Sequence, residues 1–326
     1  MDINPGIEIV NDAYNFDGVI NAFIAFNSII DQKIYIIYTN KDNSIISFNV
    51  TDKKKIKEIK NSPDNKITNY RHCLDKANKR DLCISISSSI NNIKLWNANS
   101  LELLFNFENI YDSGKIKSAC FLNDNDGLYI IASNSNYYDK TKLIQVYDLK
   151  GNKVKEISNS KDDTYYIETY HDKNSNINYI ITGNFLDVKS YNYNDDKLYF
   201  KYSDQFSKEH RCIVINDKDE KEVKLIESSK DGNVRVWDFH SGKLLQKIEL
   251  SMEKLFEICL WDSDHVYVGC GEEIIRLVDI KNGKIIKHFQ DFNSVIGLKK
   301  INDPILGECL LSQGNEIEQI LLWKKK

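Results

Sequence analysis

The feature that most constrains this chain is a short apolar segment that recurs seven times along it. In the best-marked copy, residues 231–238 read DGNVRVWD. Six other segments repeat its alternation and end on an apolar residue, usually aromatic, which we call the anchor. Successive anchors are separated by 41 to 51 residues, and self-similarity at such a period indicates a repeat architecture. The anchors are Phe48, Trp96, Tyr147, Tyr191, Trp237, Val278 and Trp323.

Each repeat is typical of about four short β-strands. The residue three positions before the anchor is Val or Ile in all seven copies, and the residue two positions before it is polar or charged in five. Alternation with a period of two predicts a strand with two unlike faces. A further apolar run precedes each anchor strand, and most anchor strands are followed by a turn and another strand. Because the 3.6-residue period of a helical solenoid is absent, the repeats predict an all-β fold, a seven-bladed β-propeller of four-stranded blades.

The two ends of the chain predict how the ring closes. Only residues 324–326 follow the last anchor, so the last unit lacks a fourth strand, whereas residues 7–10 form a spare strand before the first unit. Pairing the two would remove exposed sheet edges. We therefore expect a single domain over residues 1–326, with the N-terminal strand completing a last blade that is shared by residues 1–18 and 292–326.

The repeats resemble the WD40-repeat family across essentially the whole chain, and the fifth unit carries the resemblance best. Its residues 229–238 match the family's Ser-x-Asp…Trp-Asp ending, and a histidine stands 27 residues before Trp237, near the family's Gly-His position. The resemblance implies a buried hydrogen-bond chain that locks this blade. Its members would be His210, Ser228 or Ser229, Asp231 and Trp237.

Several positions depart from the family's pattern. The Gly of Gly-His is Glu209 in the fifth unit and Arg71 in the second. The second unit keeps His72 and Trp96 but has Ile90 where the Asp is expected, and the Trp-Asp pair is intact only once. We therefore expect the other blades to be held mainly by apolar packing.

Composition narrows the class of protein. The net charge is -4 over 326 residues, which gives no electrostatic reason to expect nucleic-acid binding. No apolar run approaches the ~18–20 residues that span a bilayer, and the N-terminus has no signal-peptide pattern. Seven cysteines without an export signal favour reduced thiols and a cytoplasmic location. They recur in predicted first and second strands, where small apolar side chains pack: Cys73, Cys83, Cys120, Cys212, Cys259, Cys270 and Cys309.

No catalytic motif stands out. The chain has no phosphate-binding loop, no nucleophile elbow and no paired Cys/His spacing for zinc, so we expect no cofactor and no resident metal. Asp42, Asp231 and Glu272 share the turn before the anchor strand. Acids in tight turns usually bond the local backbone, whereas a propeller hydrolase would use acids that converge at the channel mouth.

Aromatic and basic residues near loops point to a binding face. Tyr137 and Tyr138 fall in an enlarged loop between the second and third strands of the third unit. Tyrosine and arginine are enriched among residues that carry binding energy. If that loop opens on the same face as the connections between blades, Tyr137, Tyr138, His171 and Arg211 would form a partner-binding face near His210.

The sequence thus predicts a non-catalytic scaffold or adaptor that binds proteins or peptides within a multiprotein complex, with neither nucleic acid nor membrane as partner. Two alternatives stay open. One is a propeller enzyme, a metal-dependent hydrolase or lactonase with its site at the central channel. The other is an integrated structural subunit without transient partners. Fold analogy alone does not decide among them.

Overall fold

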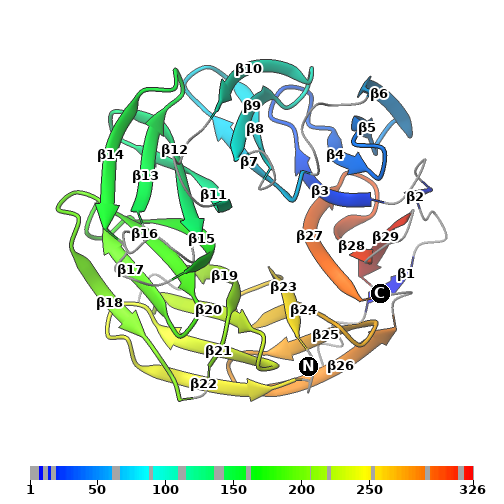
Figure 1. Cartoon of the computed structure of the whole chain (residues 1–326). Coiled ribbons are helices and arrows are strands. Elements are labelled where there is room, and N and C mark those ends of the chain that lie inside the picture. Colours follow the sequence, from blue (N-terminus) through cyan, green and yellow to red (C-terminus); the bar gives the residue numbers. More distant parts are fainter. Residues whose placement is uncertain are drawn as a thin grey trace.

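The chain forms a ring of seven antiparallel β-sheets (Figure 1). The computed structural model describes residues 7–9, 14–15, 20–60, 67–87, 91–108, 115–135, 143–158, 163–205, 207–218, 222–250, 254–290, 294–314 and 319–325. These residues contain 29 strands and no helix. The predicted all-β, seven-bladed propeller is confirmed.

Blades 1 to 6 each contain four strands that pair in chain order. Blade 1 comprises β3 (Ile20–Asn27), β4 (Ile34–Asn40), β5 (Ile45–Asn49) and β6 (Lys54–Ile59); blade 2, β7 (Asn69–Asp75), β8 (Arg80–Ser87), β9 (Asn92–Asn97) and β10 (Glu102–Phe107); blade 3, β11 (Lys115–Asp124), β12 (Gly127–Ser135), β13 (Leu143–Asp148) and β14 (Lys153–Ser158). Blade 4 comprises β15 (Thr164–Asp172), β16 (Ile177–Asn184), β17 (Val188–Asn192) and β18 (Leu198–Tyr202); blade 5, β19 (His210–Asn216), β20 (Lys224–Ser229), β21 (Asn233–Asp238) and β22 (Leu244–Glu249); blade 6, β23 (Leu255–Leu260), β24 (His265–Cys270), β25 (Ile274–Asp279) and β26 (Lys284–Gln290).

Blade 7 joins the two ends of the chain. Its strands β27 (Val295–Asp303), β28 (Gly307–Gly314) and β29 (Gln319–Lys325) are completed by β1 (Ile7–Ile9) and β2 (Tyr14–Asn15), which both pair with β29. In this register Ile9 lies opposite Trp323 and Tyr14 lies opposite Ile320. The predicted closure of the ring by the N-terminal strand is therefore confirmed.

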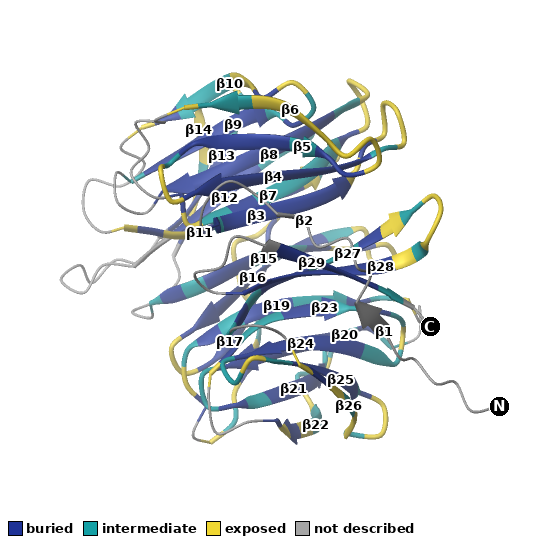
Figure 2. Ribbon diagram, turned by 90° about the vertical axis from the view of Figure 1, so that its right-hand side faces the viewer, coloured by how far each residue is buried: buried dark blue, intermediate teal, exposed yellow. Residues whose placement is uncertain are grey.

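Position within a blade sets how apolar each strand is. First strands contact the first strands of neighbouring blades and lie nearest the axis (Figure 1). Third strands carry all seven anchors and are buried on both faces, as in β21, where Val234, Val236 and Trp237 are at most 3% exposed. The fourth strands form the outer wall, so β6 is largely exposed and rich in lysine. Figure 2 shows the buried strands sandwiched between exposed turns.

First strands of adjacent blades begin on the same side of the ring, which we call the entry face, and end on the opposite side, the exit face. The starts of β15 and β19 lie side by side. Gly183 pairs with Tyr166 near the start of β15, and a Cβ atom on Gly183 would lie only 2.7 Å from the carbonyl oxygen of His210, where β19 begins. On the other side, Asn27 and Asn302 exchange hydrogen bonds of 2.8 and 3.2 Å between the ends of β3 and β27.

The cysteines lie in first and second strands, as the repeats predict. All seven are free thiols; Cys73 is half-buried and the other six are buried. Burial raises the pKa of the Cys83 thiol well above its ordinary value. These side chains therefore serve as small apolar groups between the blades.

Candidate functional site

Two of the residues predicted to lock blade 5, Ser229 and Asp231, meet around Arg235, which the family pattern does not mark as a member of the network. The Ser229 hydroxyl donates to the Asp231 carboxylate. Arg235, with a side chain 0% exposed, donates to both, and its Nη1 lies 2.8 Å from Ser229 Oγ. Its Nε also bonds Asp204 Oδ2 at 3.0 Å, from the connection that leads into blade 5. Burial alone would raise the pKa of Asp231, but the bonds from Arg235 and Ser229 lower it below the ordinary value.

His210 belongs to a second pair in the same blade. Its Nδ1 lies 2.6 Å from Oε2 of Glu227, and both side chains are at most 1% exposed. The other carboxylate oxygen, Oε1, is 3.6 Å from Nη1 of Arg235, so the two clusters adjoin. Burial alone would lower the pKa of His210, but the Glu227 carboxylate outweighs it, and the pKa lies above its ordinary value.

The anchor Trp237 does not take part in this network. Its indole Nε1 is buried and has no hydrogen-bond partner among the described residues, and the same holds for Ser228 Oγ. In blades 2 and 7, by contrast, the anchor indole donates to a serine two positions beyond its cross-strand partner: Trp96 to Ser85 at 2.9 Å and Trp323 to Ser312 at 2.8 Å. In blade 5 that position holds Glu227.

His72 does not occupy the position in blade 2 that His210 occupies in blade 5. His210 pairs with Ser229, four residues beyond the anchor's partner, whereas His72 pairs with Cys83, which is the anchor's partner itself. At ~3.3 Å per residue, His72 lies about 13 Å closer to the exit face. There its Nε2 bonds Asp81 Oδ1 at 2.9 Å, so the expected equivalence of the two histidines is wrong.

Arg211 lies at the entry face beside an exposed apolar pair. Phe185 and Leu186, in the loop between β16 and β17, are 40% and 57% exposed. The ring of Tyr165 lies 6.5 Å from that of Phe185. Burial raises the pKa of Tyr165, and the carboxylate of Glu209 raises it further. We call these side chains the entry-face patch: Tyr165, Phe185, Leu186, Glu209, Arg211 and Lys230.

Glu209 holds the two bases of the entry-face patch. Its two carboxylate oxygens accept from Arg211 Nη2 and from Lys230 Nζ, each at 2.8 Å. Burial alone would raise the pKa of Glu209, but the two bases lower it. Glu209 has φ = 48°, a left-handed conformation that is costly for any residue but glycine. Glu209 stands where the family pattern has glycine. It keeps the left-handed backbone that glycine would adopt and adds a carboxylate that binds the two bases.

The other residues expected at the binding face are placed differently or lie outside the described residues. His171 pairs with Asn178 near the end of β15 and its Nδ1 bonds that side chain at 3.0 Å. We compare the two residues by their distance along the strand from the position opposite the anchor of each blade. On this measure Arg211 lies about five residues, or ~17 Å, closer to the entry face than His171. The structure therefore places His171 at the exit face, apart from Arg211. Tyr137 and Tyr138 lie outside the described residues.

The channel-lining strands carry balanced charges. Lys299 Nζ lies 2.9 Å from Glu257 Oε1, and the Arg71 guanidinium lies 4.6 Å from the centre of the Tyr166 ring, whose hydroxyl is 3.3 Å from Glu168. Two of the turn acids that a propeller hydrolase would have used bind locally: Asp231 and Glu272 each pair with the arginine four residues later. In the described part of the chain, no three His, Cys, Asp or Glu side chains lie close enough to hold a metal ion.

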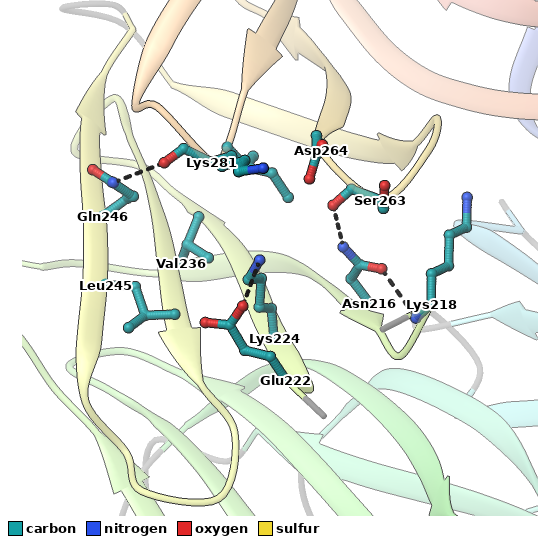
Figure 3. A pocket seen from close by; sticks show the side chains of 11 residues that line it. Asn216, Lys218, Glu222, Lys224, Val236, Leu245, Gln246, Ser263, Asp264 and Lys281 are labelled. Carbon is teal, nitrogen blue, oxygen red and sulfur yellow. Dashed lines mark hydrogen bonds and ion pairs between the residues drawn. The ribbon is translucent and has the colours of Figure 1, made fainter. Parts of the chain in front are cut away.

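A polar cavity of about 830 Å³ opens between blades 5 and 6 toward the exit face (Figure 3). Lys224 pairs with Glu222 across 3.1 Å, and Asn216 Nδ2 donates to the Ser263 carbonyl at 2.7 Å. Gln246 donates to the carbonyl of Lys281 at 3.1 Å. Many of the polar groups in its lining thus bond one another.

Comparison with known proteins finds two partial relatives. The chain is 33% identical over 63 residues to the U3 small nucleolar RNA-associated protein 21 homolog of Schizosaccharomyces pombe, and 36% identical over 66 residues to THO complex subunit 3 of Arabidopsis thaliana. Both are WD-repeat proteins. The matches cover 19% and 20% of this chain and only 7% and 21% of those relatives. No family model matches the chain. No helix in the described ranges is long and apolar enough to cross a membrane.

Proposed function

Since the seven-bladed ring and two WD-repeat relatives confirm the resemblance to the WD40-repeat family, we propose that this protein is a non-catalytic scaffold or adaptor that binds other proteins or peptides. The observation that carries the proposal is the entry-face patch, in which two adjacent apolar side chains are exposed on a loop whose backbone is fixed. Binding there would order little additional chain, which lowers the entropic cost of association.

Hydrogen bonds to neighbouring segments fix the loop that carries Phe185 and Leu186. The Phe185 carbonyl accepts from Glu209 N at 2.7 Å, and the Leu186 carbonyl accepts from Ser207 Oγ at 3.0 Å. The backbone N–H of Lys230, from the next blade, donates to the carbonyl of Lys208 at 3.0 Å. Two blades and their connection therefore present one rigid surface.

The names of the two relatives support the proposal that this protein acts within a multiprotein complex. One is named as a subunit of the THO complex and the other as associated with a small nucleolar RNA. Because the shared segments are short, we take from them only the proposal that this propeller has protein partners in a multiprotein complex. We also propose a cytoplasmic location. Free thiols are typical of a reducing compartment, which includes both cytosol and nucleus. Imaging of the tagged protein distinguishes the two.

The test is capture of partners from native extract with matched variants. Leu186→Ser removes an exposed apolar side chain from the patch, and Ile305→Ser does the same on the exit face, where Ile305 is 88% exposed. We expect a reproducible set of bound proteins that persists with Ile305→Ser and is lost with Leu186→Ser. A set unchanged by Leu186→Ser would rule out the patch, and bare, strictly monomeric protein would contradict the scaffold itself.

The same sample tests the enzyme alternative. Near-equimolar metal in an elemental scan of the purified protein, together with an activity that a chelator removes, would replace the scaffold proposal by a metal-dependent hydrolase.

A further inference from the structure

We propose that the entry-face patch recognises an acidic segment of a partner protein that also carries apolar side chains. This inference rests on the proposed function and adds the chemistry of the partner. The observation that supports it is an excess of positive charge around Phe185 and Leu186, in a protein whose net charge is negative.

The bases at the patch outnumber its acids. Glu209 is shared between Arg211 and Lys230, and Lys208, beside it in the chain, is exposed. Three basic residues therefore stand beside two acids, Glu209 and Asp163, the second of which also raises the pKa of Tyr165. The chain has a net charge of -4, so this excess is local, and a local potential of one sign attracts the opposite charge on a partner.

Three further acids nearby, Asp187, Asp204 and Asp231, do not cancel this excess, because each is already paired with a base. Asp187 is buried and lies 3.1 Å from Lys201 Nζ. Asp204 is held between Arg235 at 3.0 Å and Lys247 at 2.7 Å. Asp231 binds Arg235.

Arg211 also has an unused donor. Its Nη2 binds Glu209, but its Nε is buried and has no hydrogen-bond partner within the described structure. Buried donors are rarely left unpaired, and a guanidinium edge suits a carboxylate better than any other side chain. Because Nε itself is buried, a partner carboxylate would bind the exposed part of the guanidinium, since the Arg211 side chain is 33% exposed.

Apolar and charged contacts lie close enough for one short segment to make both. The Tyr165 ring lies 6.5 Å from the Phe185 ring, and the charges of Glu209, Asp163 and Arg211 shift the pKa of its hydroxyl. Since the backbone N–H of Glu209 donates to the Phe185 carbonyl, the two groups are held in fixed register. Glu209 itself then competes with a partner carboxylate: it orients Arg211 and Lys230, and it also neutralises part of their positive charge.

The experiment is selection of binders from a random 12-residue peptide library on the full chain, after which each selected peptide is measured against the wild type and against Arg211→Glu. We expect the selected peptides to be enriched in Asp and Glu next to Leu, Ile, Phe or Trp. Their affinity should fall at least about tenfold with Arg211→Glu, a loss typical of a close charge pair, and it should weaken as salt is raised.

Two further variants sharpen the result. Glu209→Gln keeps an acceptor for the bases but removes the competing charge, so affinity should rise about threefold. Arg80→Glu is the matched control, because Arg80 pairs with Asp75 at 2.8 Å on the exit face and is as exposed as Arg211 (32% against 33%). It should leave affinity unchanged.

The outcomes separate the two proposals. Peptides that need Leu186 but are neutral or basic, or that ignore Arg211→Glu, would overturn the acidic partner and leave the binding surface standing. Peptides that bind Leu186→Ser as well as wild type would remove the surface and the acidic partner together.

Discussion

Blades 2 and 5 solve the same packing problem with different chemistry. In blade 2 the anchor Trp96 gives its indole N–H to Ser85, a neutral hydrogen bond inside an apolar blade. In blade 5 the corresponding position is Glu227, which pairs with His210, and the anchor Trp237 has no partner in the described structure. The blade whose sequence matches the family best therefore lacks the bond between tryptophan and serine that two less typical blades make.

The comparison shows that a motif can persist while the interactions behind it change. Once a carboxylate is buried, an opposite charge must be buried with it, because an isolated charge in the interior is costly. Arg235 supplies that charge and draws in Asp204 and Asp231. The anchor of blade 5 thus lies beside an ionic network, whereas the anchor of blade 2 is held by apolar contacts and one neutral hydrogen bond.

Arg235→Met is expected to have the largest effect of the variants that test this difference. It leaves Glu227, Asp231 and Asp204 without their shared base, and breaking a buried ion pair typically costs ~3–5 kcal/mol. The matched control is Arg276→Met, at the same position of blade 6, where the partner Glu272 is 30% exposed, so that loss should be about 1 kcal/mol. Urea unfolding measures both, and equal losses would mean that blade 5 is not specially dependent on charge.

Removing one hydroxyl from each blade is expected to give an intermediate effect. Ser85→Ala leaves the buried indole N–H of Trp96 unpaired and should cost ~1–2 kcal/mol. Ser228→Ala in blade 5 removes a buried hydroxyl that has no hydrogen-bond partner in the described structure, so the free energy of unfolding should stay within about 0.5 kcal/mol or rise. A loss at Ser228 as large as that at Ser85 would show that the hydroxyl has a partner in solution.

The pH dependence of stability is the smallest expected difference. The pKa of His210 is raised in the folded protein, so its pairing with Glu227 stabilises the fold fully below about pH 6.5 and this contribution is lost as the pH rises through the higher folded pKa. Unfolding measured between pH 6 and pH 9 should show stability falling through this window. Glu227→Gln should flatten that part of the curve, and an unchanged slope would exclude this pair as its source.

The sequence predicted the fold because the relevant signal is local. Alternation over six residues and an apolar anchor define a strand wherever they occur, so all seven anchors, from Phe48 to Trp323, lie on third strands. The missing fourth strand of the last unit and the spare strand at residues 7–10 were likewise visible without any long-range information.

The site was predicted less well because its contacts join distant residues. Arg235 was noted only as a polar residue in an alternating strand, and its partner Asp204 lies 31 residues earlier. His171 was assigned to the wrong end of β15 because sequence proximity to a strand does not say at which face a residue emerges. Phe185 and Leu186 had one usable signal, two adjacent apolar residues in the loop before a third strand.

The closure of the ring by β1 and β2 has a consequence for how the protein is made. Among the strands of the ring, β1 is made first and finds its partner last, because Ile9 pairs with Trp323. At ~5–20 residues per second, the N-terminal strand would wait on the order of 15 to 60 s while blades 1 to 6 form. During synthesis the propeller is therefore an open arc, in which β1 has no partner until β29 has been made.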